Sequence, residues 1–305
     1  MRDGTKAAIV LTPADMTPRS HHRHLNSLDH HFLSWGETDA LATAILVHGF
    51  QDAAATWEDV AVPLASGGFH VIAPDMRGFG DGPRVPQGGY YYFPDYVSDL
   101  AALVRAEVKG SPLFLIGHSM GATIVAYFAG AFPDRLTKLA LIDGVGPPDN
   151  SAAVAPDRMR RWIEGAYESP PRDREPMTRA EALSRLKRFN PLVREEVLLR
   201  KIPQVSRLAD GALPGSDAVV WKTDPLHGTT SPVPFSAAGY TEFARRVTCP
   251  VLYVSGGERG FHVPDEEERL AEFARLSRVT LDGGHSLHWT MPEELAGALV
   301  RFWRE

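Results

Sequence analysis

The stretch Leu113–Gly121, LFLIGHSMG, decides how this chain folds. An apolar run typical of a buried strand leads into the pentapeptide GHSMG, and helical spacing follows directly over residues 120–131. A G-x-S-x-G pattern between a strand and a helix is typical of a sharp turn that raises a serine hydroxyl above the carboxyl edge of a sheet. Glycine is expected at both flanks because the turn leaves no room there for a Cβ. The stretch therefore predicts a parallel sheet and a nucleophile, Ser119.

Short apolar runs of the same kind recur along the chain and alternate with helical patterns. Buried strands are predicted at residues 42–47, 69–73, 113–117, 138–142 and 251–255, with a last strand at 279–281. Helices are predicted at residues 56–65, 94–108, 120–131, 265–276 and 292–303. This alternation predicts a parallel sheet with helices on both faces. The run His31–Trp35 alternates in polarity, which suits an antiparallel strand at the sheet edge.

The alternation breaks between residues 147 and 240. This stretch is rich in proline, and residues 157–201 hold 12 basic against 8 acidic side chains, although the whole chain has a formal charge of −6. Three short helical patterns are separated by prolines, at residues 158–166, 179–189 and 192–201. The predicted organisation is an N-terminal arm at 1–30, a sheet domain at 31–146 and 241–305, and an inserted helical unit at 147–240.

Length and composition exclude several classes of protein. A chain of 305 residues, 44% of them hydrophobic, can bury a core without metal or disulfide support. Charged residues make up 23%, close to the globular average, so a nucleic-acid surface is not expected. No apolar run approaches the ~20 residues of a membrane helix, and the run at residues 7–11 is short for a signal peptide. We expect a cytoplasmic globular protein, with its oligomeric state left open.

A serine hydroxyl is a weak nucleophile and needs an adjacent base. The last predicted strand ends in Asp282-Gly283-Gly284-His285, which places His285 in a loop at a strand's carboxyl end, where sites of open α/β sheets gather. His288 is the alternative base, but it is expected to begin the turn toward the final helix. We therefore assign the base to His285.

The carboxylate that would orient this base has two candidates. After the strand at 251–255, serine hydrolases of this build often carry an aspartate at the position that is Gly260 here, so the usual acid is missing. Asp143 follows the preceding predicted sheet strand, at residues 138–142, which lies beside the strand of the nucleophile. We therefore choose Asp143 as the acid. Glu258 remains the alternative because its side chain is longer.

A tetrahedral oxyanion needs two backbone N–H donors. The residue after the nucleophile, Met120, supplies one in this kind of turn. The loop that follows the strand at 42–47 reads His48-Gly49-Phe50, and the amide of Phe50 is the expected second donor because Gly49 permits a close approach.

The remaining candidates concern binding. An apolar pocket is expected to draw on His48, Trp57, Tyr91, Trp162, Trp221 and His288. Five histidines fall between His21 and His31, but no compact carboxylate or thiol set accompanies them, so we expect a solvated arm there. Neither a metal nor a cofactor is predicted.

The motifs HGF, DMRGFG, GHSMG, LIDG and GGH occur in an order and at spacings that resemble the α/β-hydrolase fold family, from about Phe32 onward. The segment 221–225, WKTDP, and the ending GGHSLHW resemble a serine-hydrolase-like subgroup. The resemblance implies a mostly parallel eight-stranded sheet flanked by helices, with residues 147–240 as a helical cap inserted after the sixth strand. Haloalkane dehalogenases and epoxide hydrolases share this scaffold but use an aspartate nucleophile, so Ser119 argues against both.

These residues together predict a cofactor-free serine hydrolase, carboxylesterase-like (EC 3.1), that cleaves an ester, thioester or lactone of a small molecule through an acyl-enzyme. Two alternatives stay open, because fold and triad residues alone do not fix the reaction. One is a lyase, cyclase, C–C bond hydrolase or cofactor-free oxygenase on the same scaffold. The other is a ligand-binding protein that retains the triad.

Overall fold

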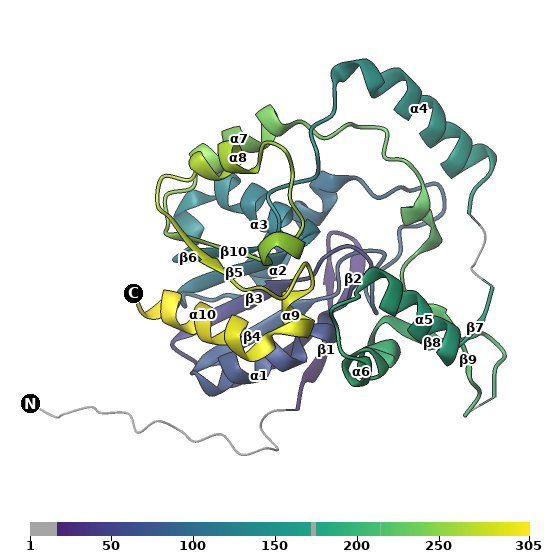
Figure 1. The fold of residues 1–305 in the computed structure, drawn as a ribbon, viewed down its shortest axis with the longest axis horizontal. Coiled ribbons are helices and arrows are strands. Elements are labelled where there is room, and N and C mark those ends of the chain that lie inside the picture. Colours follow the sequence, from purple (N-terminus) through teal and green to yellow (C-terminus); the bar gives the residue numbers. More distant parts are fainter. Residues whose placement is uncertain (1–16, 172–174, 214) are drawn as a thin grey trace, which may run out of the picture.

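A computed structural model describes residues 17–171, 175–213 and 215–305. Its centre is an eight-stranded sheet in the order β1-β2-β4-β3-β5-β6-β10-β11 (Figure 1). The strands are β1 Arg19–Leu25, β2 Leu28–Trp35, β3 Ala42–Val47, β4 Phe69–Pro74, β5 Leu113–His118, β6 Lys138–Ile142, β10 Val251–Ser255 and β11 Leu276–Thr280. In this order, neighbouring strands from β4 through β11 pair in parallel. The strand β1 pairs antiparallel with β2, and β2 pairs antiparallel with β4. The mostly parallel sheet is confirmed.

The central strands form because their apolar runs are covered on both faces. Every residue of β3, β4, β5 and β6 is buried. Ile45 pairs with Leu115, and Leu115 pairs with Leu139, so three strands lie in register across the core. Parallel strands end on the same side, which brings the loops after β3, β5, β6, β10 and β11 to one edge of the sheet.

Helices cover both faces of the sheet. They are α1 Glu58–Ser66, α2 Phe93–Glu107, α3 Met120–Ala131, α7 Ala237–Arg245, α8 Glu266–Ala271, α9 Leu287–Thr290 and α10 Pro292–Arg304. The apolar sides of α1 and α10 pack in one core layer, and those of α2, α3 and α7 pack in the other. Within the described ranges, no helix combines the length and apolar character that a bilayer crossing requires.

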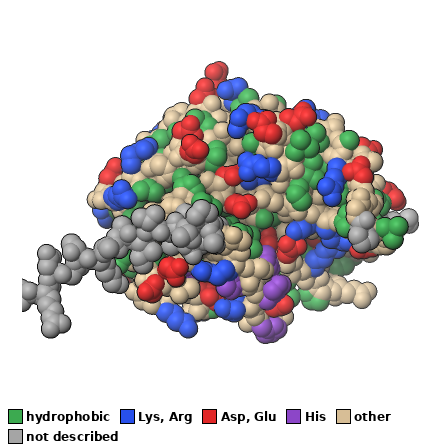
Figure 2. All heavy atoms as spheres, turned by 90° about the horizontal axis from the view of Figure 1, so that it is seen from below, with side chains coloured by type: hydrophobic (Ala, Val, Ile, Leu, Met, Phe, Trp, Pro, Cys, Tyr) green, Lys and Arg blue, Asp and Glu red, His purple; other side chains and the backbone are tan. Residues whose placement is uncertain are grey.

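The N-terminal prediction is wrong for residues 19–30. These residues are not a separate arm but form β1 and the start of β2, a hairpin at the edge of the sheet, so His31–Trp35 is antiparallel but is not the edge strand. Asn26 and Ser27 both have positive φ, 49° and 63°, which suits a two-residue hairpin turn. The side chains of an edge strand face solvent, and the exposed histidines gather on one face of the molecule (Figure 2). Residues 1–16 of the predicted arm lie outside the described residues.

The inserted unit combines helices with a small sheet. It contains α4 Ala155–Ile163, α5 Arg179–Phe189, α6 Glu195–Val205 and the strands β7 Met177–Thr178, β8 Ser206–Leu208 and β9 Ala218–Trp221. The purely helical prediction missed these strands because they are two to four residues long. The predicted end at residue 240 falls inside α7, which packs on α3 so closely that a Cβ on Gly130 would lie 2.3 Å from the carbonyl oxygen of Phe243.

Lowering the pH is expected to destabilise this fold. Burial lowers the pKa of His30, His70 and His118. The unfolded chain therefore takes up protons on these rings below about pH 6.5, while the folded chain does so only at lower pH. The free energy of unfolding therefore keeps its full value with respect to these histidines above about pH 6.5, and it falls as the pH drops below that value. Urea unfolding at pH 7.5 and 5.5 measures this, and the variant His70→Phe should show a smaller loss; an equal loss would contradict the assignment.

Candidate functional site

The serine lies at a sharp turn between β5 and α3. Ser119 has φ 53° and ψ −114°, a conformation that residues other than glycine rarely adopt. A Cβ on Gly117 would lie 2.3 Å from the carbonyl oxygen of Gly121, and a Cβ on Gly121 would lie 2.2 Å from that of Val47. The expected need for both glycines is confirmed. The turn leaves the Ser119 side chain at the wall of a cavity.

Ser119, His285 and Asp143 form one hydrogen-bonded chain. His285 Nε2 lies 3.0 Å from Ser119 Oγ, and His285 Nδ1 lies 2.7 Å from Asp143 Oδ2. The carboxylate is fully buried, whereas 39% of the His285 side chain is exposed. Because a carboxylate can only accept a hydrogen bond, the ring hydrogen of His285 lies on Nδ1. Nε2 of the neutral ring is then free to accept a hydrogen bond from the serine hydroxyl.

The loop after β10 holds the carboxylate of Asp143 in place. The amides of Gly256 and Phe261 donate to its two oxygens over 2.6 and 2.7 Å. Asp143 has φ 46°, in the left-handed region that aspartate tolerates better than most residues. With three donors, the buried carboxylate is satisfied as a hydrogen-bond acceptor.

Gly260 and Glu258 bear on which carboxylate contacts His285. A Cβ on Gly260 would lie 2.4 Å from Asp143 Oδ1, so the Asp143 carboxylate occupies the space that a side chain at 260 would need. Glu258 is exposed in the turn Gly257–Arg259, and the hydrogen bonds to His285 Nδ1 and Gly256 go to Asp143 instead. The geometry favours Asp143 over Glu258 as the partner of His285.

The loop after β3 brings a backbone peptide against the serine. His48 Nε2 accepts from the amide of Met76 over 3.0 Å, so Nδ1 carries the hydrogen and donates to the carbonyl of Gly49 over 2.7 Å. A Cβ on Gly49 would lie 3.2 Å from Ser119 Cβ. In a trans peptide the N–H points opposite to the C=O, so this bond turns the amide of Phe50 away from His48.

A cavity of about 360 Å³ opens above the serine. No aspartate, glutamate, lysine or arginine is among the described residues that line it. Its walls come from the loops after β3, β6 and β10, the turn between β5 and α3, the starts of α2 and α3 with the loop before α2, and the inserted unit. The described lining residues are Phe50, Tyr90, Tyr91, Phe93, Tyr96, Ser119, Met120, Thr123, Gly144, Gly146, Pro147, Leu226, His227, Thr229, Ser231 and Phe261. The cavity is therefore mainly apolar and aromatic.

Most of the predicted pocket residues lie elsewhere. Of the six, Tyr91 lines the cavity, and its hydroxyl donates to Asp224 over 2.8 Å. The prediction is wrong for the other five, which are outside the described lining: His48, Trp57, Trp162, Trp221 and His288. Large aromatic side chains are drawn into cores as readily as into pockets, so residue type alone did not separate the two. The tyrosine run at 90–92 was the available signal for the real wall.

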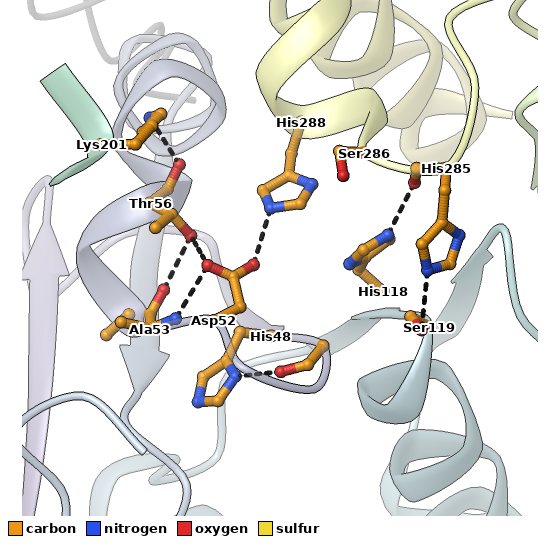
Figure 3. A network of polar contacts seen from close by, with 12 residues as sticks. His48, Asp52, Ala53, Thr56, His118, Ser119, Lys201, His285, Ser286 and His288 are labelled. Carbon is orange, nitrogen blue, oxygen red and sulfur yellow. Dashed lines mark hydrogen bonds and ion pairs between the residues drawn. The ribbon is translucent and has the colours of Figure 1, made fainter. Parts of the chain in front are cut away.

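A second polar cluster lies beside the serine and is drawn in Figure 3. Asp52 is buried and accepts from the amide of Ala53 over 2.8 Å, the hydroxyl of Thr56 over 2.6 Å and His288 Nε2 over 2.8 Å. His118 Nε2 donates to the carbonyl of His285 over 2.7 Å. Burial acts to raise the pKa of Asp52, but the hydrogen bonds that it accepts from His288 and Thr56 hold that pKa below its usual range.

The histidines of this cluster are neutral. Burial lowers the pKa of His118 well below its usual value and also lowers the pKa of His288. His288 was predicted as an alternative base or a pocket residue, whereas its side chain lies against Asp52 in the structure. No local pattern around residues 51–53 could predict this contact, because Asp52 and His288 are 236 positions apart in the sequence.

Comparison with known proteins agrees with this architecture. Residues 45–292 match the model of the alpha/beta hydrolase fold family. A serine hydrolase-like protein of Danio rerio is 27% identical over 279 residues, covering 88% of this chain and 83% of that protein. A probable serine hydrolase of Drosophila melanogaster is 25% identical over 286 residues, covering 89% and 83%.

A solved structure shows the same fold. The thioesterase domain from the curacin biosynthetic pathway superposes with a TM-score of 0.79 at 23% identity, covering 93% of this chain and 99% of that domain. The family model spans the sheet from β3 to the start of α10 and includes the serine turn, so it tests the fold prediction over most of the chain. The chain belongs to the α/β-hydrolase fold family.

Proposed function

We propose that this protein is a serine hydrolase that cleaves an ester, thioester or lactone bond of a small molecule. The observation that carries the proposal is the hydrogen-bonded chain from Ser119 through His285 to Asp143 at the wall of a cavity. A nucleophile, a base and an orienting carboxylate in this geometry need no cofactor for acyl transfer. Relatives named as serine hydrolases support the same class of reaction.

The proposed reaction proceeds in two halves. Ser119 Oγ attacks the substrate carbonyl while its proton passes to His285 Nε2, and Asp143 stabilises the resulting imidazolium. The imidazolium then protonates the leaving group, and the acyl group stays on Ser119. Water, deprotonated by the neutral His285, releases the acid and restores the serine.

The oxyanion is proposed to bind two backbone amides. Met120 is the first residue of α3, so its N–H has no acceptor within that helix. The peptide between Gly49 and Phe50 is fixed through its carbonyl by His48, which directs the Phe50 N–H away from that ring. Phe50 and Met120 both line the cavity together with Ser119. Each such donor contributes about 3 to 4 kcal/mol of transition-state stabilisation in a comparable hydrolase.

A fluorophosphonate probe tests the proposal. We expect it to label the native protein on Ser119, because only a serine with an adjacent base reacts readily with such a phosphorus centre. Mass spectrometry of the labelled peptide identifies the site. Ser286 is the matched control, since it lies next to His285 but bonds to Asn190, so Ser286→Ala should retain labelling. Folded protein that stays unlabelled at Ser119 would contradict the proposal.

The cavity predicts that the substrate is neutral. With no charged side chain among its described lining residues, a substrate carboxylate would be buried without a partner. We expect p-nitrophenyl methyl succinate to exceed p-nitrophenyl monosuccinate in kcat/KM by about 10²-fold, because an unpaired buried charge costs about 3 kcal/mol. The two esters share the same reacting bond and differ at the distal group, which is a neutral methyl ester in one and a carboxylate in the other. Equal values would show that the acyl end stays in solvent or meets a cation.

A further inference from the structure

Three side chains from distant parts of the chain meet beside the Ser119–His285 pair. One donor atom from each of Asp52, His118 and His288 lies within 4.8 Å of the other two, and all three residues are buried. Asp52 follows β3, His118 ends β5, and His288 belongs to α9 (Figure 3). No continuous motif contains them, so the sequence-based expectation of no metal, drawn from residues 21–31, does not bear on this group.

His118 offers an unshared electron pair. Its Nε2 donates to the carbonyl of His285, so its Nδ1 is an acceptor, and among the described residues that buried atom has no hydrogen-bond partner. His288 directs Nε2 at Asp52, and its Nδ1 has no partner in the described part of the chain, so transfer of the ring hydrogen from Nε2 to Nδ1 would free Nε2 as a ligand beside Asp52. A Cβ on Gly49 would lie 2.8 Å from His118 Nδ1, so the glycine keeps this side of the ring open.

The carboxylate of Asp52 has no fixed counter-ion. Its donors are the amide of Ala53, the hydroxyl of Thr56 and the neutral ring of His288. The nearby cation, Lys201, instead donates to the carbonyl of Thr56 and to Asp59. A buried carboxylate is normally paired with a cation or bound to a metal, and one carboxylate with two neutral imidazoles is a ligand set typical of zinc and related ions.

We propose that Asp52, His118 and His288 form a binding site for one divalent transition-metal ion, with Zn²⁺ and Co²⁺ as the ions of matching chemistry. The ion supplies the positive charge that Asp52 lacks and binds the unused electron pair of His118 Nδ1. It also binds His288 Nε2 in place of the hydrogen that this atom shares with Asp52.

The site lies beside the proposed catalytic pair. The rings of His118 and His285 have their centroids 4.7 Å apart, and His118 Nε2 donates to the carbonyl of His285. The metal site nevertheless rests on its own three residues and does not depend on the function proposed above.

The test begins with binding, which needs no substrate. The full chain, freed of metal with a chelator, is titrated with Co²⁺ and followed by its visible absorption, and Zn²⁺ affinity is measured by competition with a chromophoric chelator. We expect one tight ion per chain. Diffraction from Zn²⁺-soaked crystals at the zinc edge should place the anomalous peak among Asp52, His118 and His288.

Two variants should lose this ion. Asp52→Asn removes the charge, and its NH₂ group would donate to His288 Nε2 and move that ring's hydrogen to Nδ1. His288→Phe removes one ligand and keeps a flat ring against Trp57, whose indole lies 4.7 Å from it. Each should weaken Zn²⁺ binding at least about 10²-fold. Thermal unfolding identifies a variant that fails to fold, and the other then carries the test.

Control variants address the other histidines and carboxylates. His22→Gln/His24→Gln removes two exposed rings of β1, and Asp81→Asn disrupts a second group of His31, Asp75 and Asp81. Both should keep the tight ion. Unchanged binding in folded Asp52→Asn and His288→Phe, or anomalous peaks only at the control positions, overturns the site. A protein that binds Zn²⁺ here but turns over no ester would overturn the proposed function and leave the site standing.

Discussion

Replacing Ser119 with glycine is expected to abolish hydrolysis and to increase the free energy of unfolding. Loss of the nucleophile should lower kcat by about 10⁶-fold, the effect measured for the serine of a comparable triad. Stability should rise by about 1 to 2 kcal/mol, because a non-glycine residue at φ 53° and ψ −114° is strained and glycine is not. Ester turnover and urea unfolding of the same preparation measure both effects.

Ser119→Ala is the matched control for this experiment. It removes the hydroxyl but keeps a Cβ at the strained position, so it should be as inactive as Ser119→Gly and no more stable than the wild type. A stability gain in both variants would place the strain in the side chain rather than in the backbone. Substantial turnover of the natural substrate by Ser119→Ala would favour a lyase, cyclase, C–C bond hydrolase or oxygenase over the proposed serine hydrolase.

Replacing Asp143 with asparagine is expected to lower kcat by about 10⁴-fold, while Glu258→Gln stays within about twofold of the wild type. Asp143 holds His285 Nδ1 over 2.7 Å, and its replacement by an amide stabilises the wrong tautomer of the ring. Glu258 is exposed and serves as the control for loss of a nearby carboxylate. Steady-state kinetics on one neutral ester measure the ranking, and the reverse ranking would transfer the role to Glu258.

A swap of positions extends this test. Gly260→Asp alone should destabilise the protein, because its Cβ would lie 2.4 Å from Asp143 Oδ1 and would bring a second carboxylate beside the first. Gly260 has φ −73°, which aspartate adopts freely. The double variant Asp143→Gly/Gly260→Asp should therefore be more active than Asp143→Gly. Equal activity of the two would show that a carboxylate from position 260 does not reach His285.

Much of the fold could be predicted because its strands are buried on both faces. Apolar runs with β-branched residues predicted β3, β6 and β10 with their observed ends, and the glycine-flanked serine predicted the start of α3. The proposed triad residues Ser119, His285 and Asp143 could be predicted for the same reason, since each follows a strand that ends at the same edge of the sheet. Strand order then brought them into contact.

The remaining features depend on contacts that no local pattern records. The hairpin of β1 was missed because an edge strand needs no apolar face, and its histidines suggested solvent. The cavity wall combines segments such as Tyr90–Tyr91 and Thr229, which meet only when the inserted unit folds over the sheet; the hydroxyls of Tyr90 and Thr229 are 2.9 Å apart. Asp52 and His288 are likewise joined by tertiary structure alone.

The position of Asp143 directly after β6 also affects how the chain can be divided. Ser119 and Asp143 both come from the continuous segment that runs from β5 through α3 to the end of β6, whereas His285 comes from the far side of the inserted unit. A break in the polypeptide within the inserted unit would thus leave the proposed nucleophile and its carboxylate on one fragment and the imidazole on the other. Reassembly of two such fragments would be reported directly by the return of catalysis, which makes the inserted unit the natural place to split this protein into complementing halves.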